Sequence, residues 1–106
     1  MSSPIKRPEE CTSIEDVRGA IDSLDREIVD LLGRRFQYVK AITRFKKTEA
    51  DVRAEDRYRA VMQARREWAE EAGLDPNVIE EMYRLLIAHF IDEEMKDLGL
   101  VDAGRS

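Results

Sequence analysis

The feature that most constrains the fold of this chain is a long apolar pattern near its N-terminus. Apolar side chains recur at alternating spacings of three and four at Ile14, Val17, Ile21, Leu24, Ile28 and Leu31. The same phase continues through Arg35, Tyr38, Ile42 and Phe45, with no proline in between. Such spacing places these residues on one face of a helix, so the sequence predicts one helix over residues 14–45. Ser13, with Asp16 three residues later, is its predicted N-cap.

This helix is too long for the rest of one chain to cover. It would extend about 48 Å at about 1.5 Å per residue. A compact domain of 106 residues has a radius of gyration of only about 13 Å. The apolar face would therefore reach beyond the remainder of the fold. We expect a second copy of the chain to cover it, in a two-fold homodimer in which the long helices pair.

The remaining sequence predicts two further helices. Residues 47–54 are polar and lack a sustained period, and are interpreted as a mobile connection. A second helix follows over residues 55–72, and Gly73 supplies its C-terminal cap. Asp75 and Pro76 then begin a third helix that continues to about residue 98.

The predicted organisation is an all-α fold with three helices per chain, intertwined in a homodimer. Residues 1–10 form a flexible lead, residues 11–98 the helical domain and residues 99–106 a flexible tail. Charged residues make up 39% of the sequence and aromatic residues only 7%, which favours long helices over a β-sandwich or barrel.

Composition also excludes several classes of function. One cysteine, Cys11, and one histidine, His89, cannot build a Cys/His zinc site within a chain, and a Ser-His-Asp triad is disfavoured. We therefore expect no metal site. A net charge of -5 gives no footprint for nucleic acid. No run approaches the roughly 20 apolar residues of a membrane span, and no secretory leader is recognisable, so a cytoplasmic protein is expected.

Two cations interrupt the apolar face of the first helix. Arg35 occupies a position in line with Ile28 and Ile42, where a guanidinium is costly unless an anion meets it. Lys46 lies eleven residues further on, which is about 16 Å along the axis and on nearly the same face. The two side chains could close on a small dianion, with Val39 and Ile42 as the apolar floor of the pocket.

Three further charged residues extend this hypothesis. Arg18 lies too far from Arg35 to hold the same small ligand within one chain, but in an antiparallel dimer it can approach Arg35 of the other chain. Arg57 follows the predicted connection. Glu94 ends an apolar stripe of the third helix that contains Tyr83, Ile87, Phe90 and Ile91.

Each of these charged residues could instead have a purely structural role. Arg35 could set the register of a helical dimer by pairing with a glutamate of the other chain, as polar residues do in coiled coils. Arg18, Lys46 and Arg57 could be solvated surface charges, and Glu94 could reach solvent near its helix end. The chain would then be a helical interaction module without enzymatic activity.

Several short segments, in order and spacing, resemble a known family. They are Val17-Arg18, Leu32-Gly33-Arg34-Arg35, Tyr38-Val39-Lys40-Ala41, Arg44-Phe45-Lys46, Trp68-Ala69-Glu70 and Gly73-Leu74-Asp75. Residues 11–95 resemble the all-helical chorismate mutases, and among them the isochorismate-pyruvate lyase branch. The resemblance implies an intertwined three-helix dimer whose site uses Arg18 of the partner chain, with Arg35, Lys46 and Arg57. Glu94 stands where that family usually has glutamine.

The resemblance implies a reaction without a cofactor, the rearrangement of chorismate to prephenate. Arg18, Arg35 and Arg57 would bind the carboxylates, and Lys46 would face the ether oxygen where negative charge develops. The alternative is the lyase reaction, in which isochorismate gives salicylate and pyruvate. Tyr58, where many mutases of the family have glutamate, favours the lyase, although mutase activity is the first expectation. An ionised Glu94 would repel the developing charge, so activity should fall as pH rises.

Overall fold

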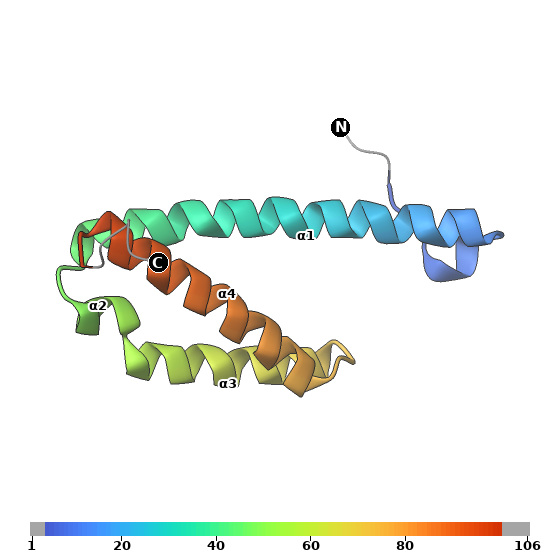
Figure 1. Ribbon diagram of the computed structural model, residues 1–106. Helices are drawn as coiled ribbons and strands as arrows, with labels where there is room; N and C mark the ends of the chain where they lie inside the picture. The colour runs from blue at the N-terminus through green and yellow to red at the C-terminus, as the bar shows by residue number, and fades with distance from the viewer. Residues whose placement is uncertain (1–3, 101–106) are drawn as a thin grey trace. The chain divides into compact units, whose positions relative to one another are not determined.

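The computed structural model describes residues 4–100, and within them every regular element is a helix (Figure 1). The order is η1 (Pro8–Glu10), α1 (Ile14–Ile42), η2 (Thr43–Phe45), α2 (Glu49–Arg53), α3 (Glu55–Glu71) and α4 (Pro76–Asp97), with η denoting a 3-10 turn. The chain divides into two compact units, Met1–Tyr38 and Val39–Ser106. The all-helical prediction and the bounds of the second and third predicted helices are confirmed.

In the first unit, a network around Asp16 fixes the start of α1. The predicted cap is present, because Ser13 Oγ accepts a hydrogen bond from the Asp16 backbone N–H at 3.1 Å. The Asp16 carboxylate in turn accepts from the Thr12 N–H at 3.0 Å and from Lys6 Nζ at 3.2 Å. The Thr12 N–H, followed by Lys6, holds the pKa of Asp16 below its ordinary value. These bonds satisfy donors that every helix N-terminus leaves free.

Residues 1–10, expected as a flexible lead, include η1, and the described part of the chain begins at Pro4. In η1 the Arg7 N–H donates to Glu10 Oε1 at 2.8 Å. Of the tail expected over residues 99–106, residues 101–106 lie outside the described part. The domain boundaries inferred from the sequence stay predictions.

The apolar face of α1 is exposed. All residues of α1 are described and none is buried. Nine of its large apolar side chains are between 43% and 74% exposed: Ile14, Val17, Ile21, Leu24, Ile28, Val29, Leu31, Tyr38 and Ile42. Helical propensity alone gives little stability to a helix in water, and packing of an apolar face usually supplies the rest. The stability of this helix therefore requires another surface to pack against its apolar face.

In the second unit, α3 and α4 form a hairpin (Figure 1). Gly73 has a φ of +77°, a left-handed conformation that glycine adopts without steric cost, and it ends α3 as predicted. The Leu74 N–H then donates to the Ala69 carbonyl at 2.7 Å. Asp75 Oδ1 accepts from the Asn77 N–H at 2.8 Å, which confirms the predicted cap of α4. The two helices are thus joined by a tight turn with both ends capped.

A small apolar core holds this unit together. Its buried side chains are Val52 of α2, Val61, Met62 and Ala69 of α3, and Met95 of α4. No helix within residues 4–100 combines the length and the apolar character that crossing a membrane requires.

Residues 47–54, interpreted from the sequence as a mobile connection without a helical period, contain a short helix that was not predicted. This helix is α2, which begins with a capping box: the Asp51 N–H donates to Thr48 Oγ1 at 3.1 Å, and Asp51 Oδ2 accepts from the Thr48 N–H at 3.2 Å. Val52 is only 3% exposed and anchors the short helix. A five-residue helix offers no apolar period, so its cap and one buried side chain were its only signals. The first helix was predicted to end at residue 45. In the structure α1 ends three residues earlier, and those three residues form the 3-10 turn η2.

Candidate functional site

The centre of the candidate site is an ion pair between Lys46 and Glu94. Lys46 Nζ donates to Glu94 Oε2 at 3.0 Å, although the two residues are 48 positions apart in the sequence. Only 16% of the lysine side chain and 8% of the glutamate side chain are exposed. Both residues were candidates from the sequence, and the structure brings them into direct contact.

Local geometry explains how Lys46 reaches this position. It follows η2 and caps it, because its backbone N–H donates to the Thr43 carbonyl at 3.2 Å. Its extended backbone, with φ of -111° and ψ of 138°, ends the helical path. Lys46 therefore projects from a chain that has just left a helix. Glu94 lies in the last part of α4, three residues after Ile91 and next to the buried Met95.

Several apolar residues of the same unit are buried or half-buried. Val52 and Met95 are buried at 3% and 2% exposure, and Val39 and Ile91 are half-buried. Ile42, expected with Val39 as a pocket floor, is exposed in the single chain. An apolar setting strengthens electrostatic interactions because little water screens them. An anionic group that reaches Lys46 here would be strongly bound, in competition with Glu94.

The three candidate arginines differ in their placement. Arg57 is exposed in the first turn of α3, in the unit that holds Lys46 and Glu94. Arg18, exposed, and Arg35, half-buried, lie on α1 in the other unit. The second unit by itself therefore contains part of the expected set, and the roles of the arginines stay predictions.

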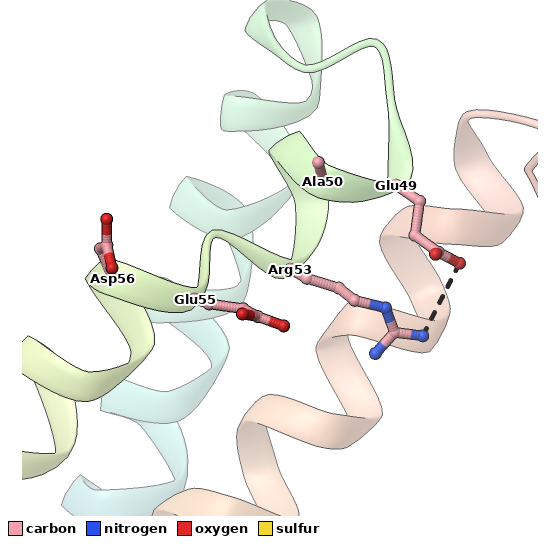
Figure 2. Close-up of a pocket in the computed structure, with 5 residues that line it drawn as sticks. All are labelled: Glu49, Ala50, Arg53, Glu55 and Asp56. Atoms are coloured by element: carbon pink, nitrogen blue, oxygen red, sulfur yellow. Dashed lines mark ion pairs between the residues drawn. The ribbon is translucent and has the colours of Figure 1, made fainter.

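A hollow of about 460 Å³ lies where α2 meets α3 (Figure 2), lined by Glu49, Ala50, Arg53, Glu55 and Asp56. Three of its five residues are acidic, and Arg53 is already paired with Glu49 at 3.8 Å. A second hollow, in the first unit, is lined by Pro4, Ile5, Asp22, Ser23, Arg26, Glu27 and Asp30. Both carry more acidic than basic groups, so both would repel a dicarboxylate.

Two residues near the site were not assigned a structural role from the sequence. Arg84 of α4 hydrogen-bonds Glu81 and Glu80, and its pKa is raised first by Glu81 and further by an interaction with the hydroxyl of Tyr58. Tyr58 therefore contacts α4 while its neighbour Arg57 remains exposed. Asp51 is the second, since its carboxylate binds the backbone that follows Lys46. The spacing of Thr48 and Asp51, matching that of Ser13 and Asp16, could have revealed it.

Comparison with known proteins places most of the chain within one group. Residues 17–95 match the family described as chorismate mutase type II. The isochorismate pyruvate lyase of Pseudomonas aeruginosa is 46% identical over 92 residues, which cover 87% of this chain and 91% of that protein. The T-protein of Haemophilus influenzae is 37% identical over 73 residues, which cover 68% of this chain but 19% of that protein.

The buried ion pair predicts unequal effects of two substitutions at Glu94. Glu94→Ala leaves the Lys46 ammonium buried without its partner and should lower the free energy of unfolding by about 3 kcal/mol. Glu94→Gln keeps an oxygen that can accept from Lys46, and should cost only about 1 kcal/mol. Urea unfolding at matched protein concentrations measures both values. Equal losses for the two variants would show that the acceptor oxygen of glutamine restores nothing, which would contradict a hydrogen bond from Lys46 as the source of the difference.

Proposed function

Since the chain belongs to the type II chorismate mutase family, we propose that it is a pericyclic enzyme whose one site accepts two related dianions. It rearranges chorismate to prephenate and splits isochorismate into salicylate and pyruvate. The observation that carries the proposal is the Lys46 ammonium beside Glu94, with both side chains largely shielded from water. Such a group can stabilise charge on an ether oxygen without any covalent step.

The reaction requires the protein to hold the substrate in one conformation and to stabilise the charge that develops on it. In chorismate the ether C–O bond breaks while a new C–C bond forms, and no nucleophile, cofactor or proton transfer to the protein takes part. The site must fold the enol-pyruvyl arm over the ring and hold it there. Arg18 and Arg35 bind the two carboxylates in bidentate geometry, and Arg57 assists. Val39, Ile42 and Ile91 form the apolar wall, while residues 47–54 exclude water.

Lys46 and Glu94 act on the ether oxygen. As the C–O bond lengthens, negative charge grows on that oxygen, and the Lys46 ammonium stabilises it. Glu94 holds that ammonium in place through their ion pair, and its carboxylate also competes with the oxygen for Lys46. Lys46, Glu94 and Arg35 are thus the proposed catalytic residues.

The lyase reaction uses the same folded arrangement of the substrate. Pyruvate takes up one hydrogen that the ring loses, so the ring becomes aromatic as the C–O bond breaks. Similarity along 91% of an isochorismate pyruvate lyase supports this as the more efficient of the two reactions. Tyr58 supports it as well, because a phenol bound to Arg84 replaces the carboxylate that would hold the hydroxyl of chorismate. The family match supports the mutase as the second activity.

The proposal includes a homodimer in which Arg18 serves the partner's site. Its support is the exposed apolar face of α1, because fully burying one leucine or isoleucine contributes about 1.5–3 kcal/mol. Nine exposed large apolar side chains on one helix favour its packing against another apolar surface. Two α1 helices related by a two-fold axis would cover both faces at once. A cytoplasmic location is also proposed, in keeping with the single free thiol, Cys11.

The direct test gives the purified protein chorismate and isochorismate separately. Chorismate loss is followed by absorbance and salicylate formation by fluorescence. We expect both reactions, with the higher kcat/KM for isochorismate. Prephenate formation alone would leave a mutase and overturn the lyase assignment. If neither product forms, the chain is a helical module and the proposed function is wrong.

Mixed dimers test the assignment of the arginines. Arg18→Ala and Arg35→Ala chains should each be nearly inactive while remaining folded dimers, since the proposed role of both groups is to bind the substrate. Refolding the two variants together creates dimers with one intact site, so about a quarter of wild-type activity should return. Recovery is the expected result only if Arg18 acts across the dimer. A mixture as inactive as its parents would place both arginines in the same chain's site.

The charge of Glu94 predicts the effect of an amide at this position. Glu94→Gln removes the carboxylate that competes with the ether oxygen for Lys46, and its amide N–H can donate to that oxygen, so kcat/KM should rise. Measuring kcat/KM for chorismate and for isochorismate with both proteins at one pH checks this. A value equal to or below that of wild type would contradict an opposing role for the Glu94 charge.

A further inference from the structure

The backbone that follows Lys46 is bound to one carboxylate. Asp51 Oδ2 accepts from the Lys47 N–H at 3.0 Å and from the Thr48 N–H at 3.2 Å. The Asp51 N–H returns a hydrogen bond to Thr48 Oγ1 at 3.1 Å. Three hydrogen bonds thus close a ring of five residues that begins immediately after Lys46.

This ring restrains Lys46 from its C-terminal side. On the other side, its own N–H donates to the Thr43 carbonyl at 3.2 Å. Backbone groups on both sides of Lys46 are therefore fixed, and its Cα has a defined position and direction. A lysine side chain has four rotatable bonds and high rotamer entropy, so a fixed base reduces the number of places its ammonium can reach.

The ring is also attached to the helix that carries Glu94. Val52, the residue after Asp51, is 3% exposed, and α2 packs against α4. After α2 the chain turns at Ala54, with a left-handed φ of +41°, and enters α3 (Figure 1). The restraint on Lys46 is thus tied to α4 by an apolar contact as well as by the ion pair itself.

Asp51 carries its charge under ordinary conditions. The N–H groups of Lys47 and Thr48 hold its pKa below the ordinary value, and the Lys46 charge contributes in the same direction. A carboxylate whose pKa is lowered by folding stabilises the folded state above the ordinary value of 3.8 and loses that effect only below it. The ring is therefore intact throughout the pH range of an enzyme assay.

We propose that Asp51 is a positioning residue for Lys46: by binding the two backbone N–H groups after Lys46, it fixes the site from which the ammonium reaches Glu94 and the substrate. The inference rests on the proposed function, in which Lys46 stabilises the charge on the ether oxygen. Asp51 itself contacts no substrate.

Three variants separate positioning from stability. Asp51→Ala removes the ring, Asp51→Asn keeps one acceptor oxygen, and Asp75→Ala is the matched control, since it also removes a helix-capping carboxylate. Asp75 lies at the opposite end of α4 from Glu94. Both alanine variants should lower Tm by a few degrees.

Only the Asp51 variants should affect the chemical step. Asp51→Ala should lower kcat about 10-fold with a smaller change in KM, because a displaced Lys46 fails mainly in the transition state. Asp51→Asn should recover part of that loss, and Asp75→Ala should keep the wild-type kcat. The proposal is overturned if Asp51→Ala and Asp75→Ala have the same kcat, whether both keep the wild-type value or both fall below it by the same factor.

A second measurement needs no turnover. If Asp51 positions Lys46 against Glu94, then Glu94→Gln should lower Tm less in the Asp51→Ala protein than in wild type. If the Tm changes of Asp51→Ala and Glu94→Gln simply add in the double variant, Asp51 does not position Lys46. If the wild-type protein nevertheless turns over substrate, the proposed function stands and only the positioning role is overturned. If the wild-type protein acts on neither substrate, the proposed function is wrong. The double-mutant cycle of Asp51→Ala and Glu94→Gln, measured by Tm, still decides whether Asp51 holds Lys46 in place.

Discussion

The ion pair between Lys46 and Glu94 is the interaction on which the second unit depends for its site. Removing two charges from water is costly, so such a pair persists only where geometry and neighbouring contacts offset that cost. Here the contact is 3.0 Å, the neighbour of Glu94 in sequence, Met95, is buried, and Val52 is buried on α2, which packs against α4. The pair joins the end of η2 to the end of α4. It thereby brings together two parts of the chain that local structure alone would leave independent.

Much of the fold was predictable because its signals are local. The cap of α1 at Ser13, the left-handed Gly73 and the cap of α4 at Asp75 each depend on residues within a few positions of one another. Helical periodicity likewise needs only one stretch of sequence. Exposure of the α1 apolar face agrees with the length argument, since no residue of that helix is buried in the described chain. The surface that covers this face depends on assembly. The sequence indicates that such a surface is needed, but not how it is arranged.

The site was predictable residue by residue but not as a set of contacts. Lys46 and Glu94 were identified because each interrupts an apolar pattern, yet their pairing across 48 positions follows from tertiary structure. Tyr58 was noticed for the family residue that it replaces, and its contact with Arg84 was invisible to any local rule. The short helix α2 was missed although its signal is local. Its one-turn cap is local, but five residues are too few to show a period.

The contrast in burial between Lys46 and the candidate arginines has a consequence for ionic strength. Salt screens charges that are in contact with water far more than charges that are not, and the Debye length is about 8 Å at 0.15 M. In the proposed roles, exposed Arg18 and Arg57 attract the dianion from solution, whereas Lys46, with 16% of its side chain exposed, acts on a charge formed inside the site. Added salt should then slow the encounter with substrate and leave the bond-breaking step nearly untouched. The protein would separate capture from catalysis by how deeply each cation is placed.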